Sequence, residues 1–335
     1  MPLVGQRWMV RRGVAPALLM VFAILAVAQD GETVARTMAV TIDDLPFGGP
    51  QLTHQGSELE WLRQRTDLIL RHLKKHEVPA IGFVNESKLL VQGEIDARVD
   101  LLAKWLDAGM ALGNHTFSHP SLTRTDLGDY QADVLHGEVL TKWLLKRYGK
   151  DIVYFRYPFN HRGPTKAIRD EFQAFLEQRG YKAAPFTVEH SDYLFNVAYV
   201  KAKNQKDAGK VRKIGNAYLR HLEVMTDFFE TISNRLFKRN IPQILLIHTN
   251  EINADYLDEM LIRLSKRGYR FVSLDQALED PAYRTPDGFA GKFGPSWLHR
   301  FSMSLGVAPV VRNGRSFPAY LLEEPDPPEF IRASQ

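Results

Sequence analysis

The chain has 335 residues, of which 44% are hydrophobic and 24% are charged, and it contains no cysteine. These fractions are those of an ordinary globular protein, so they exclude a wholly disordered chain and a membrane protein with many spans. The absence of cysteine excludes disulfides, thiol nucleophiles and cysteine-bound metals, so any metal ion must be held by histidine and carboxylate side chains. The formal charge of +4 would suit a nucleic acid or a membrane surface as partner, but it depends on the N-terminus.

Residues 1–28 have the pattern of a secretory signal peptide. Arg7, Arg11 and Arg12 precede an apolar run over residues 14–28, which is shorter than the roughly 20 residues that span a bilayer. The run ends in Ala26-Val27-Ala28, the small-x-small form that signal peptidase cleaves. We therefore predict export to the periplasm or the extracellular space, with an uncleaved anchor as the alternative. Cleavage lowers the formal charge from +4 to +1, so we expect no nucleic acid partner and no stable membrane span in the mature form.

From residue 38 onward, short apolar segments alternate with amphipathic stretches, a pattern typical of strand–helix repeats around a parallel sheet. Seven such repeats predict an α/β fold, a distorted or incomplete (β/α)7 barrel similar to a TIM barrel, over residues 35–280. The predicted strands are Met38–Asp43, Ala80–Val84, Ala111–His115, Ile152–Arg156, Lys182–Val188, Gln243–His248 and Arg270–Leu274. Barrel enzymes place their chemistry where strands end, so the polar residues at those ends are the candidates for a site.

The predicted helices begin and end at recognisable residues. The first begins at Ser57, where Glu60 three residues later completes a capping box. Further helices are predicted over residues 95–106, 129–148, 165–179 and 255–266, each followed by a glycine. A long amphipathic helix is expected over Val211–Leu236, packed against the barrel wall, with a partner-binding role as the alternative. From Pro281 onward, glycine and proline predict an irregular C-terminal extension over residues 281–335.

Carboxylates and histidines end the first and third predicted strands. Asp43 and Asp44 are adjacent, and a cation bound to one carboxylate would relieve their repulsion and leave the other as a base. His115 and His119 are four residues apart, a spacing at which two imidazoles can bind one metal ion, and Pro120 favours a turn over a long helix. Each pair alone also suits a capping turn or a chance spacing. Together, on two strand ends, they indicate a metal site.

Three further polar residues lie at or just after the ends of the later strands. Arg156 can pair with a strand-end aspartate and keep it ionised, although an ordinary salt bridge is the alternative. His248 ends an apolar strand, where a satisfied core histidine is also common. Asp192 can orient such a histidine and raise its pKa, which would make the histidine a general acid.

Five short segments contain these residues. In their order along the chain, they resemble the motifs of the polysaccharide deacetylase family, also called carbohydrate esterase family 4 or the NodB-homology domain. The segments that carry the resemblance are Thr41–Asp44, His115–Pro120, Arg156–Phe159, Glu189–Tyr193 and Leu246–His248. The resemblance extends over residues 35–279, and its fourth segment is degenerate.

The resemblance implies a role for each of these residues. The implied metal ligands are Asp44, His115 and His119, and the implied metal is zinc, with cobalt, manganese or nickel as alternatives. The implied catalytic residues are Asp43 as the general base, Arg156 as its partner, His248 as the general acid, and Asp192 as the residue that orients His248. A backbone N–H near Phe159 would stabilise the oxyanion.

The implied reaction is metal-dependent removal of N-acetyl groups from a polysaccharide that contains N-acetylglucosamine, such as peptidoglycan, chitin or poly-N-acetylglucosamine, with release of acetate. An esterase for O-acetylated glycans of the xylan type, a hydrolase of cyclic amides or ureides, and a non-catalytic glycan-binding module are the alternatives. The chain departs from the family pattern at Leu45-Pro46, Asn160, Glu189 and Tyr193. Because these positions shape the sugar-binding groove, they leave the choice of polymer open.

Overall fold

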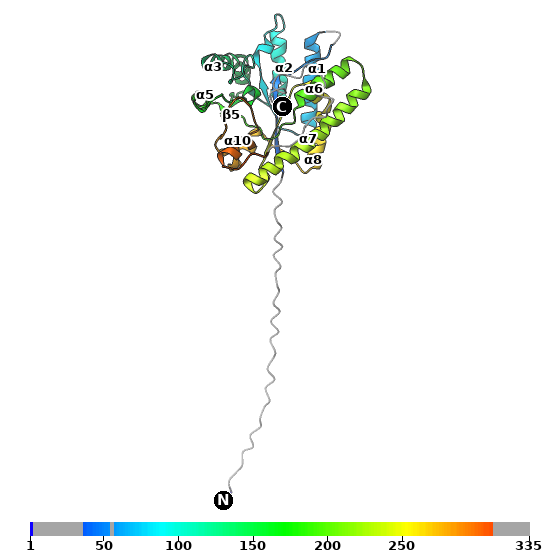
Figure 1. Cartoon of the computed structure of the whole chain (residues 1–335). Helices are drawn as coiled ribbons and strands as arrows, with labels where there is room; N and C mark the ends of the chain where they lie inside the picture. Colours follow the sequence, from blue (N-terminus) through cyan, green and yellow to red (C-terminus); the bar gives the residue numbers. More distant parts are fainter. Residues whose placement is uncertain (3–35, 54–56, 311–335) are drawn as a thin grey trace. The chain divides into compact units, whose positions relative to one another are not determined.

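The structure of the protein is a computed structural model that describes residues 1–2, 36–53 and 57–310 (Figure 1). Almost all of the predicted signal peptide, residues 3–28, lies outside these ranges, so export stays a prediction. Within the described ranges, no helix has the length and apolar character needed to cross a membrane.

The described strands form one sheet of seven, paired in parallel in the order β5-β4-β3-β2-β1-β6, with β7 paired to β1. The strands are β1 (Thr37–Leu45), β2 (Ile81–Val84), β3 (Ala111–Asn114), β4 (Tyr154–Phe155), β5 (Lys182–Ala183), β6 (Gln243–His248) and β7 (Arg270–Phe271). Val188, a few residues after β5, forms a parallel bridge with Leu245 of β6, so the two ends of the strand order meet. The sheet is therefore curled and closed by one bridge, which confirms the predicted incomplete barrel.

The apolar strands of this sheet are buried on both faces, as parallel sheets usually are. Successive residues of β1 enter different hydrophobic clusters, because neighbouring side chains of a strand point to opposite faces. Ala39 packs with Phe83 and Ile244, whereas Met38 and Val40 join the large cluster that the helices cover. The predicted fifth strand is the largest overestimate, because Pro185 has no N–H to donate and only two residues before it are strand.

The helices surround this sheet (Figure 1). They are α1 (Glu58–Lys75), α2 (Ile95–Asp107), α3 (Leu127–His136), α4 (Val139–Arg147), α5 (Lys166–Gln178), α6 (Asp192–Asn204), α7 (Ala208–Phe237), α8 (Glu251–Lys266), α9 (Leu274–Leu278) and α10 (Trp297–Ser304), with short 3-10 helices at η1 (Glu86–Leu89), η2 (Pro158–Asn160) and η3 (Pro281–Arg284). Helix α1 follows Ser57 as predicted, but the Ser57 side chain makes no capping hydrogen bond, so the predicted capping box there is wrong. The capping box that does form joins Ser273 and Gln276 at the start of α9.

The helices differ from the prediction in two places. The helix predicted over residues 129–148 is in fact two, α3 and α4, separated at Gly137. A Cβ at Gly137 would lie 2.4 Å from the backbone carbon of Thr116, so the break coincides with a close approach to the loop between the two predicted histidine ligands. Helix α6 was not predicted. Its buried residues, which include Leu194, Phe195 and Tyr199, leave no clear polar stripe, so the helical period is weak.

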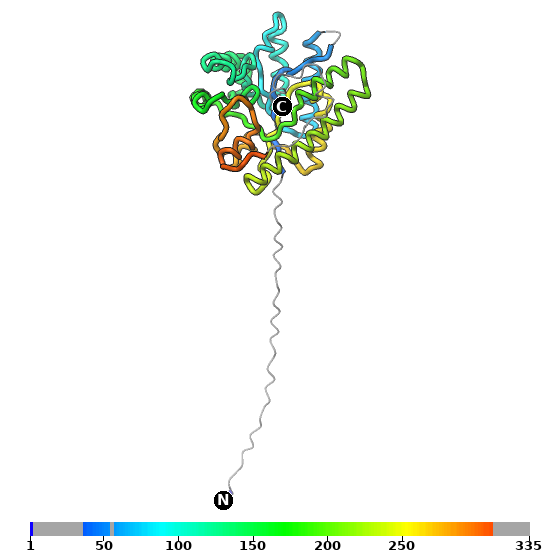
Figure 2. The backbone as a smooth tube through the Cα atoms, in the orientation of Figure 1, coloured from blue at the N-terminus to red at the C-terminus, as the bar shows by residue number. Residues whose placement is uncertain are grey.

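The long helix predicted over Val211–Leu236 is confirmed as α7, which has 30 residues. It packs against α6, α8 and α10 (Figure 2). The described part of the C-terminal extension is irregular as predicted, except for η3 and α10, and it packs against the barrel. One contact is the Ser296 hydroxyl, which donates to the Thr187 carbonyl at 2.7 Å.

Candidate metal and catalytic centre

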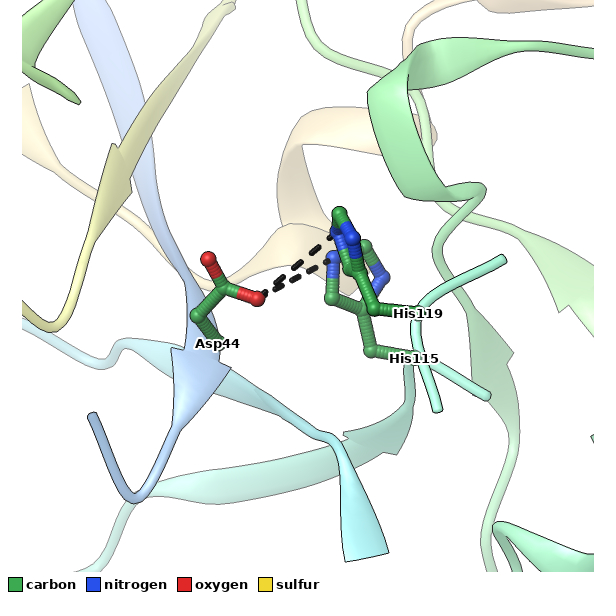
Figure 3. A group of neighbouring side chains, drawn as sticks. All are labelled: Asp44, His115 and His119. Atoms are coloured by element: carbon green, nitrogen blue, oxygen red, sulfur yellow. Dashed lines mark ion pairs between the residues drawn. The ribbon is translucent and has the colours of Figure 1, made fainter. Parts of the chain in front are cut away.

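Asp44, His115 and His119 meet at the carboxyl ends of β1 and β3 (Figure 3). Their candidate ligand atoms all lie within 4.8 Å of one another. The Nε2 atoms of His115 and His119 lie 4.0 Å and 3.7 Å from Asp44 Oδ1. One carboxylate and two imidazoles form the donor set of many zinc sites, and three protein ligands leave coordination positions for water and substrate. The residues therefore fit a divalent metal ion.

Local backbone geometry turns both aspartates of the first strand toward the centre. Neighbouring strand residues normally point to opposite faces. Between Ile42 and Leu45, however, the pairing of β1 with β2 is irregular, and Asp44 has a φ of 73° in the left-handed region. An irregularity of this kind re-aims a side chain at the end of a strand.

Hydrogen bonds and local backbone geometry position the two histidines. The Nδ1 atom of His115 is 2.8 Å from the Arg156 carbonyl, and a proton on Nδ1 leaves Nε2 as the metal-binding nitrogen. Thr116 and His119 both have positive φ values, and the Thr116 hydroxyl accepts the His119 N–H at 3.0 Å. Burial lowers the pKa of both histidines, which keeps them neutral as metal binding requires.

Lys88 of η1 is a member of the centre that the motifs did not predict. Its ammonium lies 3.2 Å from Asp44 Oδ1 and also donates to the Asp44 carbonyl at 3.3 Å and to Asn85 Oδ1 at 2.8 Å. Burial alone would raise the pKa of Asp44, but Lys88 and the nearby histidines outweigh it and hold that pKa well below its usual range. The only signal in the sequence is the position of Lys88 shortly after a strand end.

Asp43 and Arg156 form the buried side of the centre. Asp43 Oδ2 lies 3.7 Å from His115 Nε2, and Asp43 Oδ1 lies 3.7 Å from Arg156 Nε. The Arg156 guanidinium is fully buried, donates to the Thr41 hydroxyl at 2.7 Å and lies over the Phe83 ring. Burial raises the pKa of Asp43 to about 6, although the charges of Arg156 and His248 oppose the rise. The structure thus brings these two residues together, as the sequence predicted.

His248 and Asp192 lie on the other side of Asp43, which pairs with His248 in the register of β1 and β6. The Nδ1 atom of His248 is 2.8 Å from Asp192 Oδ1, and the His248 backbone N–H donates to Asp192 Oδ2 at 2.8 Å. Burial alone would lower the pKa of His248, but Asp192, with smaller effects of Asp44 and Asp43, raises it to about 9. Asn250 and Asn253, which no motif indicated, also donate to Asp192.

The turn at Phe159 and Asn160 adjoins the candidate metal ligands. Both residues have positive φ values, 57° and 53°. The half-exposed Phe159 ring lies edge-on to the His119 ring, with 4.6 Å between the ring centres. Asn160 is held by the C-terminal extension, because its amide donates to the Pro295 carbonyl at 2.6 Å and its own carbonyl accepts from Arg300 at 2.8 Å. Composition alone did not indicate that the extension reaches this turn.

Comparisons with known proteins show which family the chain is similar to. A family model described as polysaccharide deacetylase matches residues 30–184. The peptidoglycan-N-acetylmuramic acid deacetylase PdaA of Bacillus subtilis (strain 168) is 28% identical over 225 residues, which cover 66% of this chain and 69% of PdaA. An uncharacterized 30.6 kDa protein of the fumA 3′ region of Geobacillus stearothermophilus is 28% identical over 222 residues, which cover 66% of this chain and 68% of that protein. A solved structure of the peptidoglycan deacetylase PdaC from Bacillus subtilis aligns with a TM-score of 0.47 and 20% identity over 76% of this chain and 95% of PdaC.

The matched residues 30–184 contain three of the five segments that carry the resemblance, including all three candidate metal ligands. The remaining two segments hold His248 and Asp192, which the fold brings to the same centre. The chain is therefore similar to polysaccharide deacetylases over the residues that contain the candidate metal ligands.

Proposed function

We propose that the protein is a metal-dependent hydrolase that removes N-acetyl groups from a polysaccharide containing N-acetylglucosamine and releases acetate. The observation that carries the proposal is the placement of a complete set of groups around one point. Three candidate metal ligands lie together, a buried carboxylate adjoins them, and an aspartate-bound histidine ends the neighbouring strand β6. A non-catalytic glycan-binding module would not need the buried carboxylate or the oriented histidine.

In this proposal Asp44, His115 and His119 hold the divalent ion, with zinc as the first candidate because of the ligand set. A divalent ion bound there supplies Lewis-acid chemistry, since it makes a water more acidic and polarises the acetyl carbonyl. Asp43 accepts the proton of the attacking water. Arg156 beside it favours the ionised form that a base requires.

The other half of the reaction needs a proton donor, because an amide nitrogen cannot leave as an anion at neutral pH. His248 has the raised pKa of an acid that is protonated at that pH, and Asp192 holds its Nδ1, which leaves Nε2 to donate. The backbone N–H near Phe159 is the proposed donor to the oxyanion. The carbon–nitrogen bond breaks, a carbon–oxygen bond forms, and the products are acetate and a free amine.

The substrate is proposed to be a cell-wall or secreted glycan. One relative, PdaA, is named for peptidoglycan, and the predicted signal peptide would carry this chain to the same side of the membrane as such a polymer. Peptidoglycan is therefore the first polymer to test, ahead of chitin and poly-N-acetylglucosamine.

Acetate release from N-acetylglucosamine oligomers, peptidoglycan and acetylated xylan, each with zinc and with a chelator, tests the proposal. We expect chelator-sensitive release from an N-acetylated substrate. Asp43→Asn should keep metal binding and lose roughly 100- to 10,000-fold in turnover, whereas His119→Ala should lose the metal. Release from xylan alone would indicate an esterase, and metal binding without acetate from any glycan would indicate a binding module.

A further inference from the structure

We infer that the long helix α7 positions the general acid, through a directed chain of buried hydrogen bonds that runs from Tyr218 by way of Asn253 to Asp192. The inference rests on the proposed function, because it concerns how His248 is held for proton donation. It assigns a role to a helix that no matched motif covers.

The chain of hydrogen bonds begins on α7. The Tyr218 hydroxyl donates to Asn253 Oδ1 on α8. The Asn253 amide nitrogen then donates to Asp192 Oδ2 at 2.5 Å and to the His248 carbonyl at 2.8 Å. Tyr218, Asn253 and Asp192 are all at least 98% buried, so these bonds are shielded from water. Buried networks of this kind are stronger than exposed ones and restrict the side chains that form them.

The direction of each bond follows from the groups present. The Asp192 carboxylate and the His248 carbonyl can only accept, so the NH2 group of Asn253 must face them and its Oδ1 must face Tyr218. His190 lies on the other side of Tyr218, with its Nε2 3.0 Å from the hydroxyl oxygen. When Nε2 donates to that oxygen, the Tyr218 proton is left to point at Asn253. The chain therefore converges on Asp192, which in turn holds Nδ1 of His248.

The packing of α7 on α8 is matched to this contact. Gly215 lies one turn before Tyr218, and a Cβ at Gly215 would lie 2.0 Å from the Tyr256 ring on α8. Residues three apart share one face of a helix, so Gly215 and Tyr218 face Tyr256 and Asn253 along the same line of contact. A larger residue at position 215 would push the helices apart. The close approach lets the Tyr218 hydroxyl reach Asn253.

Tyr218→Phe tests the inference, because it removes the hydroxyl and keeps the ring. The variant and the wild-type chain are compared on two substrates, N-acetylglucosamine oligomers and 4-nitrophenyl acetate. The amide needs a proton from His248, whereas the nitrophenolate leaves as an anion without one. We expect kcat on the amide to fall on the order of tenfold, as for other residues that orient a functional group, and kcat on the aryl ester to change by less than about twofold.

Tyr269→Phe is the matched control. Tyr269 is also a buried tyrosine whose hydroxyl bonds to α7, at 2.6 Å from Glu230 Oε1, but it touches neither Asn253 nor Asp192. We expect both rates to stay unchanged in this variant. Asn253→Ala removes the middle residue of the hydrogen-bond chain and should show the same selective loss of amide hydrolysis. This variant therefore tests the inference if Tyr218→Phe fails to fold. Thermal unfolding and zinc binding of each variant establish that it is folded.

An unchanged amide rate in folded Tyr218→Phe, or an equal loss on both substrates, would overturn the inference, since a structural defect does not depend on the leaving group. A wild-type chain that releases acetate neither from the oligomers nor from peptidoglycan would overturn the proposed function instead. The two failures are distinguishable because the second appears before any variant is made.

Discussion

At the residue scale, two adjacent aspartates have different environments and therefore different proposed roles. Asp43 is buried with Arg156 at 3.7 Å, and its pKa is raised to about 6. Asp44 is beside Lys88 and two histidines, and its pKa is lowered. Pairs of titratable groups whose environments push their pKa values apart are typical of acid–base sites. The contrast supports Asp43 as the proton acceptor and Asp44 as the permanently charged ligand.

The raised pKa of His248 leads to a prediction about pH. The acid must be protonated, so the rate of amide hydrolysis should fall as the pH rises through about 9. In Asp192→Asn the charge that opposes the effect of burial is removed, the pKa of His248 drops, and this fall should begin at lower pH. A profile of kcat/KM against pH, recorded for the wild-type chain and for Asp192→Asn, measures the pH at which the rate falls. A descending limb at the same pH in both forms would contradict the role of Asp192.

At the element scale, the centre depends on where strands and helices stop. The candidate ligands lie at the irregular end of β1 and in the loop after β3, and Asp44, Thr116 and His119 there have positive φ values. The break between α3 and α4 is part of the same arrangement. At Gly137, the backbone of the loop that carries His115 and His119 lies too close for a side chain.

Gly137→Ala should therefore disturb both stability and metal binding. Its Cβ would meet the Thr116 carbon at 2.4 Å and the Phe117 nitrogen at 2.5 Å, which are backbone atoms and cannot rotate away. We expect the free energy of unfolding to fall by about 1–3 kcal/mol and zinc affinity to fall with it. Denaturant unfolding and zinc titration measure the two effects.

Gly128→Ala in α3 is the matched control, because a Cβ at Gly128 meets nothing within 4 Å. An alanine in a helix is favoured over glycine by roughly 0.5–1 kcal/mol, so this variant should be slightly more stable. Its zinc affinity should be unchanged. Equal zinc affinity in Gly137→Ala and the wild-type chain would count against the link between the helix break and the ligand loop.

At the scale of the whole molecule, the C-terminal extension contacts a turn beside the candidate metal centre. Asp287 lies between two buried arginines, 2.6 Å from Arg162 Nη1 and 3.0 Å from Arg300 Nη1. Arg300 in turn bonds the carbonyl of Asn160, next to Phe159. Residues more than a hundred positions apart thus hold the turn that adjoins His119.

Asp287→Asn should cost much more stability than Asp280→Asn. The first change leaves two buried guanidinium groups without their counter-charge, which typically costs about 3–5 kcal/mol. The second breaks a pair between Asp280 and the more exposed Arg239, which is worth about 1 kcal/mol or less. Denaturant unfolding compares the two variants. Similar losses of stability in both variants would show that Asp287, with Arg162 and Arg300, stabilises the fold no more than the Asp280–Arg239 pair does.

The barrel and the candidate groups for the proposed chemistry could both be predicted from the sequence alone. Parallel strands bring their carboxyl ends to one side of the sheet. Strand-end residues such as Asp43, His115 and His248 can therefore be expected to lie close together before any tertiary contact is known. Strand periodicity and the order of motifs sufficed for this part. The signal peptide and its cleavage remain predictions from the same kind of pattern.

Beyond Arg156 and Asp192, the residues that hold those groups in place became visible only in the folded structure. Lys88 meets Asp44 across 44 positions, Tyr218 meets Asn253 across 35, and Asn160 meets Pro295 across 135. No local period or spacing encodes such pairs, because each depends on how two elements pack after folding. The same reason explains why α6 and the break at Gly137 were missed, since burial on all sides and a close backbone approach leave little trace in the hydrophobic pattern.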